Sequence, residues 1–140
     1  MKRLLWLDDY RNPYKGNWVD MFSPIKNGLD IYWVKSYDEF TRWILLNGLP
    51  DIICFDHDLG YDIDPNVTDV LYHNDEISVF FLQPYNDDEK TGYDAAKWLC
   101  DYCFDNNLKL PLYGIQSSNE VGKENIDCLL QNYIKYVENE

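Results

Sequence analysis

Two short apolar runs of the chain end abruptly in carboxylates, and they decide the fold. The first is Leu4-Leu5-Trp6-Leu7 followed by Asp8-Asp9, and the second is Ile52-Ile53-Cys54-Phe55 followed by Asp56-His57-Asp58. Short apolar runs of this kind are typical of buried strands in a parallel sheet. The carboxyl ends of such strands share one edge of the sheet, where ligands bind at the point of strand reversal. We therefore expect the four aspartates to converge there.

The rest of the chain alternates between strand and helix patterns. We expect strands at about 3–7, 31–34, 51–55 and 110–115, and helices at about 18–25, 36–47, 91–104 and 118–137. Capping pairs support two of the helix starts, at Ser36 and Thr91, and Ser118 or Asn119 caps the last helix. This order predicts a three-layer α/β fold with a parallel sheet of about four strands. The pattern resembles a flavodoxin-like receiver without its fifth strand, and this resemblance implies the strand order 2-1-3-4.

The last two helices each show an apolar face that we expect to pack on the core. On the first, this face comprises Tyr93, Ala96, Cys100, Cys103 and Phe104, and on the second Ile126, Leu129, Leu130, Tyr133 and Val137. The pair Cys100 and Cys103 has no second cysteine pair that would complete a zinc site. We interpret it as core packing.

An insertion of about thirty residues, 61–90, interrupts the alternation after the third strand. It is either a surface loop or hairpin without a role, or a lid over the strand edge from which it emerges.

Length, charge and hydropathy limit the possible functions. The 140 residues fit a single domain, 1–140, and 46% of them are hydrophobic, as in a packed globular protein. The net charge of -13 disfavours an extended nucleic-acid duplex and an anionic membrane as partners. No apolar stretch is long enough for a membrane span or an export signal, so we expect reduced cysteines and a cytoplasmic location.

Carboxylates brought together repel one another unless a cation or shared protons relieve them. Oxygen-only ligands suit Mg²⁺ or Mn²⁺, so Asp8, Asp9, Asp56 and Asp58 are candidate metal ligands. Acidic residues at strand ends also cap helices or simply face solvent. Two acidic clusters at matching strand ends favour the metal site.

Several further residues are candidates for catalysis or phosphate binding. His57 lies between two acids and is either a general acid or base, or a structural residue. Arg11 offers a bidentate fork to a phosphate, or organises the aspartates. The remaining candidates stand at helix starts, where they bind an anion or only cap the helix: Thr91, Gln116, Ser117 and Asn119.

Four motifs together resemble the cyclic-phosphate processing receiver-like domain family over nearly the whole chain outside the insertion. They are Leu7-Asp8-Asp9-Tyr10-Arg11-Asn12-Pro13, Asp56-His57-Asp58-Leu59-Gly60, Thr91-Gly92-Tyr93-Asp94 and Ser117-Ser118-Asn119. The resemblance implies a bacterial or phage protein that processes cyclic phosphates of nucleotides or RNA ends. It implies metal or phosphate roles for Asp8, Asp9 and Asp56, with Arg11, His57, Ser117 and Asn119 around the substrate. The family's last motif begins with His, and here that position is Gln116.

Two functions of different classes follow. The first is a metal-dependent phosphoesterase, a hydrolase that opens the cyclic phosphate of a small nucleotide or an RNA end, with Asp56 and His57 catalytic. The alternative is a non-catalytic receiver-like module that binds a nucleotide or a protein, or is phosphorylated on Asp56. A glutamine cannot exchange a proton near neutral pH, so Gln116 bears directly on this choice.

Overall fold

The computed structural model describes residues 1–59, 68–73, 76–84 and 90–139. Its elements follow the order β1 (Lys2–Leu7), α1 (Trp18–Phe22), β2 (Leu29–Val34), α2 (Tyr37–Asn47), β3 (Ile52–Phe55), β4 (Thr68–His73), β5 (Glu76–Pro84), α3 (Gly92–Asp105), β6 (Leu112–Ile115) and α4 (Glu120–Glu138).

The sheet has the strand order β5-β4-β2-β1-β3-β6, and its four strands β2, β1, β3 and β6 are parallel. This confirms the predicted 2-1-3-4 order. The last residues of these strands are in register, because Leu7 is paired with both Val34 and Phe55, and Phe55 with Ile115. The residues that follow the strands therefore stand side by side at one edge of the sheet.

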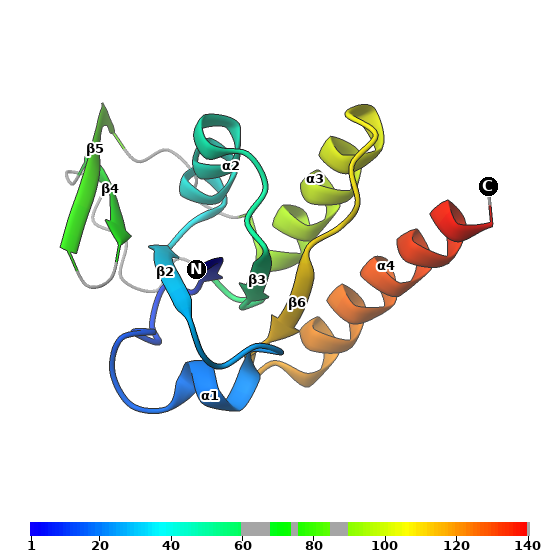
Figure 1. Ribbon diagram of the computed structural model, residues 1–140, viewed down its shortest axis with the longest axis horizontal. Coiled ribbons are helices and arrows are strands. Elements are labelled where there is room, and N and C mark those ends of the chain that lie inside the picture. The colour runs from blue at the N-terminus through cyan, green and yellow to red at the C-terminus, as the bar shows by residue number, and fades with distance from the viewer. Residues whose placement is uncertain (60–67, 74–75, 85–89, 140) are drawn as a thin grey trace.

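Two apolar clusters hold helices against the two faces of the sheet, which gives the predicted three layers. On one face α2, α3 and α4 pack through residues such as Phe40, Leu99 and Leu130, all at most 2% exposed. On the other face the short helix α1 packs through Val19 against Trp6 and Trp33. Figure 1 shows α4 and the β4–β5 pair at opposite ends of this arrangement. No helix in the described ranges is long and apolar enough to cross a membrane.

The described part of the insertion extends the sheet. Strands β4 and β5 pair antiparallel with each other, and β4 pairs antiparallel with β2 through Tyr32↔His73 and Trp33↔Tyr72. The predicted hairpin is thus present as two added strands beyond β2. A lid over the strand edge stays a prediction, since 60–67, 74–75 and 85–89 lie outside the described residues.

Cys100 and Cys103 lie on the buried face of α3, in the core, as expected. They are 7% and 0% exposed. Burial raises the pKa of the Cys100 thiol to about 12 and that of Cys103 to about 11. Both thiols therefore stay protonated at neutral pH and act as apolar packing groups.

Two of the residues expected on helix core faces are exposed, and those predictions were wrong. Phe104, 55% exposed, lies at the end of α3, where its ring meets that of Tyr136 on the surface. Val137 is 42% exposed. Helix α4 has 19 residues and spans about 28 Å, whereas the four residues of β6 span about 13 Å, so the end of α4 runs past the strand.

Prolines explain two boundaries that differ from the expected ones. Helix α1 ends at Phe22 instead of Ile25 because Ser23, which precedes Pro24, is extended. Strand β6 begins after Pro111, two residues later than expected. Such shifts at element ends leave the sheet topology unchanged.

We expect Gly92→Ala to destabilise the protein, because α3 begins in direct contact with the end of β3. A Cβ at residue 92 would lie 1.7 Å from the Asp56 carbonyl oxygen, and the Gly92 N–H donates to the His57 carbonyl at 2.7 Å. Relieving this clash should cost about 2–3 kcal/mol in the free energy of unfolding, measured by urea denaturation. Lys97→Ala, at an exposed site of the same helix, is the control. Equal midpoints for the two variants would contradict the close approach.

Candidate metal and phosphate site

Three polar side chains follow directly on the in-register strand ends. The amides of Asp8, Asp56 and Gln116 donate to the carbonyls of Val34, Leu7 and Phe55 at 3.0, 2.8 and 2.9 Å, which continues the hydrogen-bond ladder one residue past the strands. The three residues are 0%, 5% and 1% exposed. These backbone hydrogen bonds therefore fix the backbone positions of the three residues, whose side chains are buried.

Asp8, Asp9 and Asp56 form a cluster in which one carboxylate oxygen from each residue lies within 4.8 Å of the others. All three residues are buried. Carboxylate oxygens are the ligands that hard divalent cations such as Mg²⁺ and Mn²⁺ prefer, so the donor set fits these ions. The expected convergence of these three aspartates is thus present in the structure, and we call them the acidic triad.

Arg11 is the cation that borders the acidic triad. The Asp8 carboxylate accepts hydrogen bonds from the amides of Tyr10 and Arg11, at 2.8 and 2.9 Å, which folds the chain back after β1. The guanidinium then lies 3.1 Å from Asp8 Oδ2 and 3.7 Å from Asp56 Oδ1. It also donates to the hydroxyl of Ser118 at 2.6 Å. Arg11 therefore joins the ends of β1, β3 and β6.

Burial and the neighbouring carboxylates raise the pKa of the Asp56 carboxyl to about 7. Burial is the largest cause, and the negative charges of Asp8 and then Asp9 add to it. The guanidinium of Arg11 and the His57 amide, which donates to Asp56 Oδ1 at 2.9 Å, act in the opposite direction. Arg11 offsets only part of the effect on Asp56, and a divalent cation beside this carboxyl would favour its ionised form.

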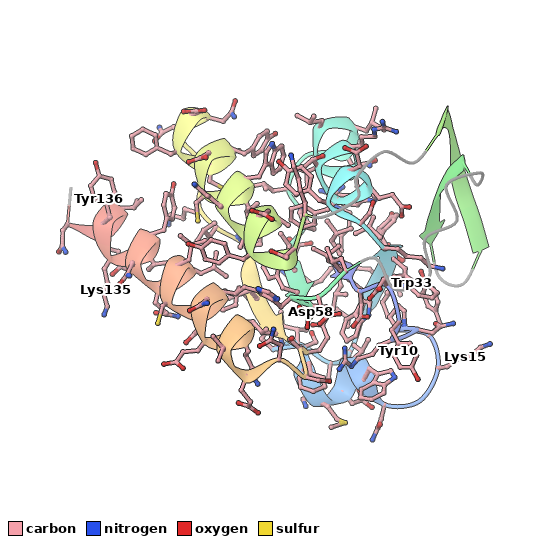
Figure 2. All side chains as sticks on the ribbon, turned by 180° about the vertical axis from the view of Figure 1, so that it is seen from behind. Tyr10, Lys15, Trp33, Asp58, Lys135 and Tyr136 are labelled. Carbon is pink, nitrogen blue, oxygen red and sulfur yellow. The ribbon has the colours of Figure 1, made fainter. Side chains whose placement is uncertain are left out.

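The ring of His57 is held by Asp58 and by α4, and it lines a hollow that also includes Thr91 and Tyr93. Its Nδ1 lies 2.8 Å from Asp58 Oδ1, and its ring covers Gly122, where a Cβ would approach the ring to 2.4 Å. Asn119 Nδ2 lies 3.4 Å from both carboxylate oxygens of Asp58. Figure 2 shows Asp58 in the central region of the molecule. A carboxylate on Nδ1 fixes the imidazole orientation and leaves Nε2 for other contacts.

Asp58 therefore stands apart from the acidic triad. Its side chain is 44% exposed and is bound to His57 and Asn119. Of the four expected metal ligands, Asp8, Asp9 and Asp56 lie close enough together that they could hold a metal ion, whereas Asp58 lies outside this group and contacts His57.

Gln116 follows β6, and its buried side chain reaches the end of β1. Its Nε2 donates to the Leu7 carbonyl at 3.0 Å. Its Oε1 is buried and has no hydrogen-bond partner among the described residues. A buried acceptor left without a donor is costly, and such atoms occur at binding sites.

The structure gives capping roles to the remaining predicted phosphate-binding residues. Thr91 forms a capping box with Asp94 at the start of α3. Asn119 caps α4 by accepting from the Gly122 amide at 2.9 Å, and the Ser117 hydroxyl accepts from the Asn119 amide at 3.0 Å. These bonds shape the loop around Arg11 and His57, whatever else the residues bind.

Three residues hold the site through contacts that were not predicted from the sequence. Ser118 binds Arg11, Trp18 stacks under the same guanidinium with its ring centroid 5.3 Å from Cζ, and Gly122 makes room for His57. Ser118 was named as a possible helix cap, but not as a partner of Arg11. Ser118 and Gly122 contact residues far away in the chain, which no local pattern predicts, whereas Trp18 begins the helix that follows the Arg11 loop.

A receiver-like fold with an acidic triad at its strand edge defines the class of this protein. The family model of the cyclic-phosphate processing receiver domain matches residues 3–132. The chain therefore belongs to that family. No match was found among curated proteins or among solved structures.

We expect the stability of the metal-free protein to fall as the pH rises from about 4 to about 7. The folded state keeps a proton on Asp56 in this range, because its pKa is raised from 3.8 to about 7, whereas the unfolded state releases it. Asp56→Asn should remove the contribution of Asp56 to this pH dependence. The substitution should therefore stabilise the metal-free protein more at pH 8 than at pH 5. Urea denaturation at both pH values measures the difference. Asp101→Asn, on the exposed surface of α3, controls for the change in net charge.

A difference between Asp56→Asn and wild type that is the same at pH 5 and pH 8 would contradict the raised pKa. The raised pKa would also be contradicted if Asp101→Asn changed the stability between pH 5 and pH 8 by as much as Asp56→Asn does.

We expect Mg²⁺ or Mn²⁺ to raise the melting temperature at pH 8, because an ion that binds the folded state alone stabilises it. Asp9→Asn should abolish most of this shift, since Asp9 belongs to the acidic triad. Asp58→Asn should retain it, since Asp58 binds His57 and Asn119 instead. Differential scanning fluorimetry with and without chelator measures both. An equal loss in the two variants would contradict the assignment of Asp58.

Proposed function

We propose that this protein is a metal-dependent phosphoesterase that opens the cyclic phosphate of a small nucleotide or an RNA end. The buried acidic triad beside Arg11 is the observation that carries the proposal. It combines ligands for a divalent cation with a donor for phosphate oxygens, and it lies in a chain of the cyclic-phosphate processing receiver family.

Asp8, Asp9 and Asp56 would hold Mg²⁺ or Mn²⁺. When bound, the ion supplies electrostatic stabilisation of the charge on a phosphoryl group. It also favours the ionised form of Asp56, whose pKa is otherwise raised to about 7.

Arg11 would bind the phosphate and stabilise the charge that develops on its oxygens. Its position is set by Asp8, Ser118 and the face of Trp18. A guanidinium has five N–H donors in a fixed fork, so these contacts leave donors for a phosphate oxygen. Arginine held in this way binds without reorganising.

His57 would transfer the proton that ring opening requires. Water adds to phosphorus, one ester P–O bond of the ring breaks, and the leaving oxygen takes up a proton while the water loses one. Asp58 holds Nδ1 of His57, so the proton would move through Nε2. Asn119 in turn supports the orientation of Asp58.

The net charge of -13 favours a small substrate over an extended duplex. A single cyclic phosphate needs one local cationic site, which Arg11 and the bound ion would provide. A long polyanion would meet the acidic surface around it.

Turnover of cyclic phosphates tests this function directly. We expect Mn²⁺- or Mg²⁺-dependent opening of at least one of four substrates: a 2′,3′-cyclic nucleotide, a 3′,5′-cyclic nucleotide, a cyclic dinucleotide and an RNA with a cyclic phosphate end. Asp56→Asn and chelator should each lower the rate by about 100-fold or more, and His57→Gln by about 100-fold. Asp101→Asn is the matched surface control. Activity unaffected by chelator and by Asp56→Asn would contradict the mechanism.

Gln116 favours a second candidate, a receiver-like module that binds a phosphate-bearing nucleotide without cleaving it. The residue is buried and offers an unpaired amide oxygen but no group that exchanges a proton near neutral pH. Nucleotide binding without turnover in the wild type, with turnover gained in Gln116→His, would support this candidate. Intact-mass measurement after incubation with acetyl phosphate distinguishes phosphorylation of Asp56 from nucleotide binding.

A further inference from the structure

Strand β6 is the outermost strand of the sheet on the side opposite the β4–β5 pair, and within the described ranges it pairs with β3 alone (Figure 1). The amides of Leu112 and Gln116 donate to β3-side carbonyls, those of Asp51 and Phe55. Because successive residues of a strand direct their backbone groups to opposite sides, the N–H and C=O groups of Tyr113 and Ile115 are directed away from β3. They form the open edge of the sheet.

Two hollows lie along this edge and meet at Tyr113. The first, about 570 Å³, lies between the end of α1 and the first half of α4. The second, about 660 Å³, lies between Pro24, the 108–113 segment and the last half of α4. Between them the Tyr113 hydroxyl donates to Asp127 at 2.7 Å and accepts from Gln131 at 2.5 Å, and we call the two hollows together the β6 groove.

The two ends of the β6 groove differ in chemistry. The end beside Leu112 is apolar, with Leu108, Leu112 and Val137 40%, 53% and 42% exposed. The end beside Ile115 carries three acids, Glu120, Glu124 and Asp127, against one base, Lys123.

An apolar groove beside an unpaired strand edge is the surface to which extended peptides add in β-strand addition. Main-chain hydrogen bonds provide affinity, and side-chain pockets on alternate residues provide selectivity. The acidic end and the net charge of -13 disfavour a second copy of this chain as the occupant and favour a basic one.

We infer that the β6 groove binds an extended segment of a partner protein as an added strand, with apolar side chains beside Leu112 and Lys or Arg beside Glu120 and Glu124. This inference concerns a surface formed by β6, α1 and α4 and stands independently of the acidic triad. It also accounts for the exposure of Val137, which lines the apolar end of the groove.

The probe is a displayed library of random peptides about ten residues long, the upper end of ordinary strand length. We expect selection against the full chain to enrich peptides with alternating apolar residues at one end and Lys or Arg at the other. An enriched peptide, synthesised, should slow hydrogen exchange at the Tyr113 and Ile115 amides by about tenfold or more at saturation. The Leu112 and Gln116 amides, already bonded to β3, serve as the internal reference.

Two variants test the two ends of the groove. Leu112→Lys places a charge at an exposed apolar position and should weaken peptide binding by about tenfold. Glu124→Lys reverses one charge at the acidic end and should weaken it by about threefold. Asp101→Lys makes the same charge reversal on α3, outside the groove, and should leave binding unchanged. Denaturation midpoints confirm that each variant is folded.

Any of four results would overturn the inference. They are the enrichment of no peptide, binding that Leu112→Lys does not weaken, binding that leaves exchange at Tyr113 and Ile115 unchanged, and enrichment of acidic peptides. A dimer of the full chain in sedimentation that Leu112→Lys dissociates would also overturn it, by making a second copy the occupant.

Discussion

The packing of three buried carboxylates into one small space is the constraint on which the site depends. Asp8, Asp9 and Asp56 stand together because the strands before them end in register, and Arg11 contacts Asp8 and Asp56. Burial and this repulsion leave Asp56 with a pKa of about 7. Such a cluster lowers the stability of the folded protein. Buried carboxylates with a raised pKa are typical of functional sites, including sites that bind a cation.

Most of the elements could be predicted from the sequence because apolar runs, capping pairs and their alternation are local patterns. The strand order 2-1-3-4 came from the resemblance to a flavodoxin-like receiver, and the strand pairing confirms it. The errors arose where tertiary context decides. Helical spacing placed Val137 on a core face, but the helix continues past β6, and beneath its last turns there is a groove instead of a strand. Likewise, the position of Phe104 on the apolar side of α3 did not reveal that α3 ends at the surface.

The site was predictable in its location and less so in its contacts. Strand ends identified Asp8 and Asp56, because the carboxyl edge follows from topology alone. Which acid meets which partner depends on loop geometry, so the sequence could not separate Asp58, the partner of His57, from the acidic triad. The close fit of the His57 ring against Gly122 joins residues from different elements and leaves no local pattern.

The proposed function requires that the acidic triad bind a divalent cation beside Arg11. Anomalous scattering from crystals of the protein soaked in Mn²⁺ tests this binding. We expect a peak at about 2.1–2.2 Å from carboxylate oxygens of Asp8, Asp9 and Asp56. A crystal without such a peak, or with the ion on Asp58 and away from the acidic triad, would contradict it.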